Sequence, residues 1–219
     1  MSNEFRDYSS DDITVQYSVK RCIHAAECVR RLPQVFDTNK RPWIQPANAS
    51  ADDIADMIPN CPSGALRYQR KDGGSVEAVP QHNTLRLAEN GPLYLRGSLE
   101  IQDSSGNVLS TDTRVALCRC GASSNKPYCD NSHKDIGFTA APVTSVNATF
   151  PESAAQPAGQ VVVTPAQNGP LLLQGNVELL DAKGGVVFQG DKAALCRCGG
   201  SQNKPFCDGT HNTIGFLAD

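Results

Sequence analysis

The chain has 219 residues, of which 39% are hydrophobic, and its 20 Lys and Arg residues against 23 Asp and Glu residues leave a formal net charge of −3. Because the basic residues are scattered and do not form blocks, the composition gives no reason to expect a nucleic-acid partner. No stretch approaches the roughly 18 apolar residues of a membrane-spanning helix, and the N-terminal residues are polar and acidic. We therefore expect a cytoplasmic protein with no membrane partner.

The first part of the chain predicts a compact α+β unit. Apolar side chains alternate in the manner of a strand, then recur at helical spacing, and Ser50 followed by Asp53 resembles the capping box that begins a helix. The expected elements are strands at 13–18 and 65–69, an extended segment at 41–45, and helices over 22–36 and from residue 50 to about Pro59.

The remainder of the chain contains an internal repeat. Residues 90–138 align without gaps with residues 168–216, and 26 of the 49 aligned pairs are identical. Each copy is too small to bury much core alone, so we expect two related modules packed as a pair about a pseudo-twofold axis. The segment 70–83 before the first copy and the segment 139–159 between the copies have the composition of linkers.

Each module should be mostly β. A short strand, at 85–87 or 161–163, precedes a longer strand with an apolar residue at alternate positions. A hairpin turn follows, and the returning strand delivers two cysteines. The apolar face of the longer strand comprises Leu93, Leu95, Leu99 and Ile101 in the first copy and Leu171, Leu173, Val177 and Leu179 in the second.

The nine cysteines favour metal sites over disulfides. Their number is odd, and they fall into three groups of three, two of which a histidine completes. A reducing cytoplasm leaves such thiolates free to bind metal.

Both copies of the repeat contain the pattern C-x-C-x8-C-x3-H, which predicts a four-ligand metal site. Two cysteines two apart on an extended segment share one face, and a cysteine and a histidine four apart share one face of a helical turn. We expect that turn to begin at Pro127. Three thiolates and an imidazole suit either tetrahedral zinc or a two-iron cluster. The candidate ligands are Cys118, Cys120, Cys129 and His133, and then Cys196, Cys198, Cys207 and His211.

The segment CRCGGSQNKPFCDGTH and its counterpart in the first copy resemble the CDGSH iron–sulfur family, also called NEET proteins. The resemblance implies one [2Fe–2S] cluster per module, with the three cysteines and the histidine as its ligands. Single-motif members of the family form strand-exchanged homodimers, so two CDGSH modules, at 82–139 and 160–217, are expected to build both halves within one chain. Asn131 stands where the signature has glycine, and we expect the geometry to survive because Asn tolerates a left-handed backbone.

The N-terminal unit, residues 11–72, has a C-x5-C pair and a distant Cys-Pro, at Cys22, Cys28 and Cys61. With the runs PWIQP and CPSGAL, these cysteines resemble single-cluster bacterial ferredoxins of the divergent 4Fe–4S type. Ala25 stands where the ordinary ferredoxin run has its middle ligand. The resemblance implies a [3Fe–4S] cluster on three thiolates, or a [4Fe–4S] cluster whose fourth iron takes His24, water or an outside ligand. Three structural cysteines are the alternative.

The expected fold class is therefore α+β, with a ferredoxin-like domain followed by two mostly-β CDGSH modules packed as an intrachain pseudo-dimer. Three potential clusters suggest one-electron transfer between redox partner proteins, and no nucleophile–base pair or phosphate-binding loop indicates an enzyme. Two alternatives are an iron–sulfur cluster donor to apo-acceptor proteins and a redox or pH sensor. A third, from another class, is a zinc-binding interaction module. We expect a monomer with internal pseudo-twofold symmetry.

Two further interpretations concern single residues. Arg119 and Arg197 lie between ligand cysteines, where they could tune a potential, dock a partner or be plain surface residues. His82 falls in the first linker, and we expect it to be solvated.

Overall fold

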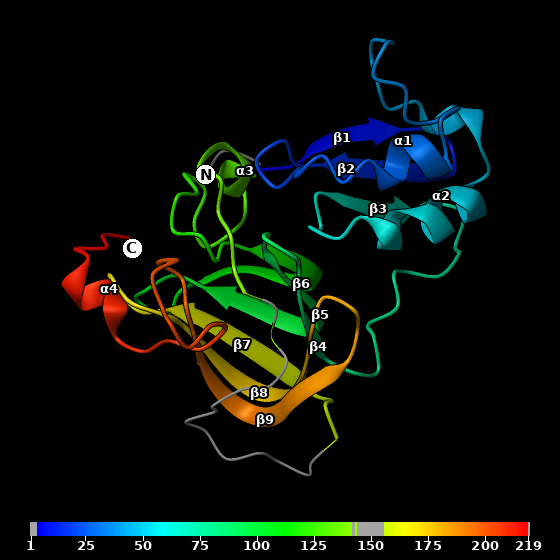
Figure 1. Ribbon diagram of the computed structural model, residues 1–219. Helices are drawn as coiled ribbons and strands as arrows, with labels where there is room; N and C mark the ends of the chain where they lie inside the picture. The colour runs from blue at the N-terminus through cyan, green and yellow to red at the C-terminus, as the bar shows by residue number, and fades with distance from the viewer. Residues whose placement is uncertain (1–3, 142, 144–155, 219) are drawn as a thin grey trace. The chain divides into compact units, whose positions relative to one another are not determined.

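The computed structural model describes residues 4–141, 143 and 156–218, and the chain divides into two compact units, Met1–Ala78 and Val79–Asp219 (Figure 1). The boundary falls within the predicted linker 70–83. Helices and strands are both present, which confirms the α+β class. Among the described residues, no helix is long and apolar enough to cross a membrane.

The first unit contains a three-stranded antiparallel sheet in the order β1-β2-β3. The strands predicted at 13–18 and 65–69 are confirmed as β2 and β3. Strand β1 has no clear signal in the sequence because it is a short edge strand of mostly exposed residues that pairs with β2 alone. The elements are β1 Arg6–Ser9, β2 Ile13–Tyr17, α1 Glu27–Arg31, the 3-10 helix η1 Pro46–Asn48, α2 Ala51–Met57, the 3-10 helix η2 Ile58–Asn60 and β3 Leu66–Arg70.

Helix α1 is much shorter than the helix predicted over 22–36. It begins only at Glu27 because the preceding residue, Ala26, has φ 62°, in the left-handed region that a right-handed helix cannot include. His24 is left-handed too, with φ 52°. Helical spacing cannot reveal this loop, since alanine itself favours helix.

The other predictions for the first unit have mixed outcomes. Ser50 Oγ accepts a hydrogen bond of 3.1 Å from the amide N–H of Asp53, which confirms the cap of α2. Residues 41–45 form no strand, and Ile44 makes only an isolated bridge with Phe36. The apolar core of the first unit contains residues of the sheet and of the helices, including Ile13 and Val15 of β2 and Ile54 of α2.

The second unit is built on one six-stranded sheet. The alternation predicted for the longer strands is confirmed, because all eight apolar residues named for them are buried. The strands are β4 Thr84–Leu87, β5 Leu93–Gln102, β6 Val108–Leu117, β7 Gln160–Pro165, β8 Leu171–Leu180 and β9 Val186–Leu195, and the helices are α3 Ser132–Asp135 and α4 Thr210–Thr213.

Strands of the two repeat copies exchange partners in this sheet. Strand β4 pairs antiparallel with β5 of its own copy and parallel with β8 of the other copy. In the same way, β7 pairs antiparallel with β8 and parallel with β5. Strands β6 and β9 pair with β5 and β8 as the returning arms of two hairpins. Each copy therefore supplies strand edges that the other copy pairs with.

The helical turn expected to begin at Pro127 begins instead at Ser132. Tyr128 still belongs to the sheet, through a bridge with Leu117, so Pro127 lies outside the helix. Asn131 precedes the helix with φ 76°, and Gly209 occupies the equivalent position with φ 86°. The expectation that Asn131 adopts the left-handed backbone of the glycine is therefore confirmed.

Asn83, within the predicted linker 70–83, is part of the fold. Its buried side-chain amide donates 2.9 Å hydrogen bonds to the carbonyl oxygens of Gly159 and Asn176. Its Oδ1 accepts a bond of 3.2 Å from the amide N–H of Ser98. His82, next to it, is exposed as expected. Most of the predicted connector 139–159 lies outside the described residues.

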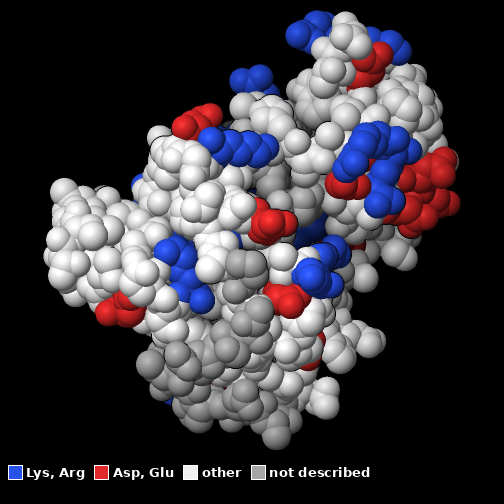
Figure 2. Space-filling view, viewed as in Figure 1, with Lys and Arg blue, Asp and Glu red and all other residues white. Residues whose placement is uncertain are grey.

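On the face shown in Figure 2, Lys and Arg side chains lie in small groups near Asp and Glu side chains, and most of the remaining surface is uncharged. This distribution agrees with the scattered charges of the sequence.

Candidate metal centres

The first two cysteines of each repeat copy form a close pair, here called the inner pair. In both copies the two Sγ atoms, of Cys118 and Cys120 or of Cys196 and Cys198, lie 3.8 Å apart. Strands β6 and β9 end just before these pairs. Two thiolates on one tetrahedral metal ion, with metal–sulfur bonds of about 2.3 Å, stand at about this separation.

The remaining two candidate ligands of each copy form an outer pair. Cys129 Sγ lies 3.5 Å from His133 Nδ1, and Cys207 Sγ lies 3.3 Å from His211 Nδ1. The amide N–H of Asn131 or Gly209 points at the cysteine sulfur from 3.4 Å, which is possible because both residues are left-handed. Each outer pair therefore also presents two donor atoms toward one position.

The candidate ligand atoms of the two repeat copies are thus arranged in pairs. In the part of the chain that the structure describes, no three or more His, Cys, Asp or Glu side chains are arranged as ligands of a single ion. All nine cysteines are free thiols.

Burial keeps several of these thiols protonated until a cation replaces the proton. It raises the pKa of Cys129 and of Cys196 to about 11, and raises the pKa of Cys207 as well. In the first inner pair, a hydrogen bond with Cys120 lowers the pKa of Cys118, and amide N–H groups lower it further. A bound metal cation compensates for the free-energy cost of burying such thiolates. Binding of the metal should therefore release protons from the cysteines.

The two inner pairs approach each other through their glycines. A Cβ atom placed on Gly121 would lie 2.5 Å from the carbonyl oxygen of Cys198, and one placed on Gly199 would lie 2.5 Å from that of Cys120. Both glycines have positive φ, of 86° and 81°. Only glycine permits this contact, since any side chain would force the two ligand loops apart.

The arginine within each inner pair is buried, so the interpretation as plain surface residues is wrong. Arg119 is 3% exposed, and its guanidinium donates to the carbonyl oxygens of Gly91 and Ala88 at 2.9 and 2.5 Å. Arg197, 1% exposed, donates in the same way to Gly169 and Ala166 at 3.0 and 2.7 Å. Burial lowers the pKa of Arg119, while the thiolates of Cys196 and Cys120 act on it in the opposite direction. The guanidinium of Arg119 therefore interacts electrostatically with candidate ligands of both copies.

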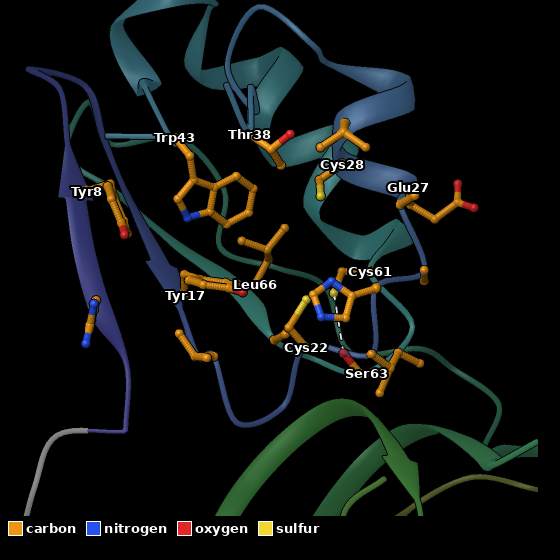
Figure 3. A pocket seen from close by; sticks show the side chains of 18 of the residues that line it. Tyr8, Tyr17, Cys22, Glu27, Cys28, Thr38, Trp43, Cys61, Ser63 and Leu66 are labelled. Atoms are coloured by element: carbon orange, nitrogen blue, oxygen red, sulfur yellow. Dashed lines mark hydrogen bonds between the residues drawn. The ribbon is translucent and has the colours of Figure 1, made fainter. Parts of the chain in front are cut away.

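The three cysteines of the first unit line one cavity of about 540 Å³ (Figure 3). Cys22, Cys28 and Cys61 come from separate segments of the chain, and all three are half-buried. Burial, and then the charges of the other two, raise the pKa of Cys28 to about 11. The structure thus brings Cys61 together with Cys22 and Cys28, which lie more than thirty positions before it in the sequence.

The surroundings of this cavity are largely apolar and aromatic. Tyr17 and Trp43 line it with ring centroids 4.9 Å apart, and burial, followed by a hydrogen bond with the Cys22 thiol, raises the pKa of Tyr17. Cys61 Sγ lies 3.7 Å from Ser63 Oγ, the dashed line of Figure 3. His24 also lines the cavity, but as an exposed residue.

The donor sets fit iron–sulfur clusters. Three thiols around one cavity suit a cubane-type cluster with an open or externally ligated iron, and two pairs in each repeat copy suit a two-iron cluster with histidine on one iron. The sequence motifs name these candidate donors but not the groups around them. Arg119 and Gly121 lie inside the recognised motif, yet Arg119 is buried with its hydrogen bonds to Ala88 and Gly91, and Gly121 lies against Cys198 of the other copy.

Two family models match the chain. One, described as divergent 4Fe-4S mono-cluster, matches residues 8–71, and the other, described as iron-binding zinc finger CDGSH type, matches residues 90–134 and 168–212. The uncharacterized protein YjdI of Escherichia coli strain K12 is 34% identical over 67 residues, which are 31% of this chain and 88% of YjdI. YjdI of Escherichia coli O157:H7 matches to the same extent. No solved structure matches the chain.

Proposed function

Since this chain belongs to the iron-binding CDGSH type, with a divergent 4Fe-4S mono-cluster domain ahead of its two CDGSH segments, we propose that it carries single electrons on iron–sulfur clusters. Each CDGSH module holds one [2Fe–2S] cluster, with the inner pair on one iron and the outer pair on the other. Cys22, Cys28 and Cys61 hold a third cluster, [3Fe–4S] or [4Fe–4S]. The two modules act as an intrachain pseudo-dimer.

Bound at these sites, the clusters supply one-electron redox chemistry, and a histidine ligand raises the potential relative to an all-cysteine set. The chain's own residues prepare the sites. Amide N–H groups of Asn131 and Gly209 stabilise negative charge on the outer cysteines, and buried arginines place positive charge beside the inner pairs.

One observation carries the proposal of electron transfer. A Cβ atom on Gly121 would lie 2.5 Å from the carbonyl oxygen of Cys198, and one on Gly199 equally close to that of Cys120, so the backbone segments that carry the two inner pairs pass close to each other. A structural metal site gains nothing from such an approach. Electron exchange between two centres requires a short path, and this contact supplies one.

The rest of the proposed role rests on the composition and the motifs of the sequence. The protein works as a monomer in the cytoplasm and exchanges electrons with redox partner proteins, without a reaction of its own on a substrate. Neither nucleic acid nor membrane is among its partners.

The test is the content of iron, acid-labile sulfide and zinc in protein purified without oxygen, with low-temperature EPR before and after reduction. About seven or eight irons with matching sulfide, and a magnetic interaction between the reduced [2Fe–2S] signals, support the proposal. About four irons leave the first unit empty and limit the proposal to the modules. Stoichiometric zinc without sulfide contradicts it and makes the chain a zinc-binding module.

A further inference from the structure

The inner pairs of the two repeat copies are equally buried, but the outer pairs differ in their exposure to solvent. Cys118 and Cys196 are both 1% exposed. In the first module the outer pair is buried as well, with Cys129 at 3% and His133 at 8% exposed. In the second module the corresponding Cys207 and His211 are only half-buried.

One position of the sheet accounts for part of this difference. Tyr94 of β5 pairs with Ala116 of β6, and the carbonyl oxygen of Ala116 accepts a 2.8 Å bond from the amide N–H of Cys129. Positions 94, 116 and 129 therefore lie side by side on three neighbouring backbone segments, with only the small Ala116 between Tyr94 and Cys129. Burial, followed by the charge of Cys129, raises the pKa of Tyr94, in keeping with a phenol close to that sulfur.

The equivalent position of the second module carries leucine. Leu172 of β8 pairs with Ala194 of β9, whose carbonyl oxygen accepts from the amide N–H of Cys207 at 2.8 Å. The backbone arrangement is thus the same, but the leucine side chain is shorter and 40% exposed. Ala194 is half-buried, whereas Ala116 is 2% exposed.

The imidazole of the first module is covered from a second side. A Cβ atom placed on Gly91 would lie 3.7 Å from Nε2 of His133, so the ring edge opposite the sulfur faces the turn before β5. At Gly169, the equivalent glycine, the three nearest atoms belong to Ala166 and Gln167 and lie within 3.7 Å. The half-buried state of Cys207 and His211, and the shorter side chain at position 172, leave the second outer pair more open than the first.

We propose that the second module is the exchange site of the protein, at which iron or electrons pass to and from a partner, and that Tyr94 closes the first module so that its cluster is retained. Tyr94 is a positioning residue, because it covers a ligand and is not one. The inference rests on the proposed function, since it presupposes that both modules hold clusters.

The experiment follows cluster loss from the anaerobic full-length protein in excess bathophenanthroline, an iron chelator, by visible absorbance and by the EPR signals of the [2Fe–2S] clusters. Two phases of equal amplitude are expected from the modules, with rates that differ about tenfold, the effect of about 1.4 kcal/mol of lost cover. Leu172→Tyr should slow the fast phase, and Tyr94→Leu should accelerate the slow one. Tyr94→Phe, which keeps the ring, is the matched control and should leave both rates unchanged.

The outcomes separate the inference from the proposed function. Loss of both clusters in one phase overturns the inference while both remain [2Fe–2S] sites, and so do two phases that the substitutions do not move. Absence of sulfide before the chelator is added contradicts the proposed function itself. Should Tyr94→Leu fail to retain its cluster during purification, Leu172→Tyr still decides the matter, because it adds cover to an intact module.

Discussion

Arg119 shows how one buried side chain can act on two candidate metal centres. Its guanidinium donates hydrogen bonds to the carbonyl oxygens of Ala88 and Gly91. The Cζ atom of the same group lies 5.5 Å from the ring centroid of Phe138. The thiolates of Cys120 and Cys196, one from each repeat copy, raise the pKa of Arg119 against the effect of burial. A fixed positive charge in this position favours the reduced, more negative form of a cluster.

Replacing this charge should lower the reduction potential. For Arg119→Gln we expect a decrease on the order of 70 mV, the Coulomb energy of one charge at about 10 Å with an effective dielectric constant of about 20. A redox titration followed by EPR measures the shift.

Arg119→Lys is the control, because it keeps the charge while losing the forked hydrogen bonds. If Gln and Lys lower the potential equally, the arginine acts through packing alone. Arg197→Gln should shift the potential in the same direction, since its environment is equivalent.

At the level of single residues, the sequence identifies donors but not the groups that cover them. A cysteine or histidine at motif spacing is recognisable because metal chemistry restricts the choice of residue. Tyr94 sits on an alternating strand, where a half-buried aromatic residue is ordinary, so nothing in the sequence shows that it lies beside Cys129. Its role follows only from the register of β5 and β6.

Among the elements, the strand pairings depend on one amide side chain. Asn83 precedes β4 and joins three backbone segments, at Ser98, Gly159 and Asn176. Gly97 leaves room for it, since a Cβ atom there would lie 2.0 Å from Asn83 Oδ1. The parallel pairings of β4 with β8 and of β5 with β7 both begin near this side chain.

Asn83→Ala should therefore lower the free energy of unfolding of the second unit by about 2–4 kcal/mol. The substitution removes three part-buried hydrogen bonds of the buried Asn83 side chain, two to carbonyl oxygens and one from an N–H group, at about 1–3 kcal/mol each before relaxation and access of water. Chemical denaturation followed by circular dichroism measures the loss.

His82→Ala is the adjacent control. The side chain is exposed, so its removal should change the free energy of unfolding by less than about 0.5 kcal/mol. Equal effects of the two substitutions would mean that the segment before β4, and not the amide, stabilises the pairings.

The predictions of helices and strands are correct where one periodicity of apolar residues dominates. They are wrong where the backbone leaves the commonly populated regions of φ and ψ. The alternating strands of the second unit and the cap of α2 follow from local pattern. Helices α1 and α3 start later than predicted because Ala26 and Asn131 are left-handed, and backbone conformation of this kind has no periodic signal.

For the molecule as a whole, we expect each of the two units to fold when it is produced without the other. We do not expect this of the two modules of the second unit. Fragments Met1–Ala78 and Val79–Asp219 each contain a complete apolar core and should fold when produced apart. A fragment of residues 79–143 lacks the partners of β4 and β5 on the other copy, and it should not fold as a monomer. Circular dichroism and light scattering distinguish these outcomes.

Mixing the fragment 79–143 with residues 156–219 should restore the folded sheet, since the pairings run between strands and not through the connector. A folded monomer of the fragment 79–143 alone would contradict the importance of the exchanged pairings.

The exchange of strands within one polypeptide has an evolutionary consequence. When two identical subunits share a sheet, every substitution occurs twice, so a change that opens one site to solvent opens the other too. Here positions 94 and 172 are encoded separately, and they hold Tyr and Leu on equivalent strands. The duplicated chain is thus free to specialise its halves, one for retention and one for turnover, without losing the interface that both require.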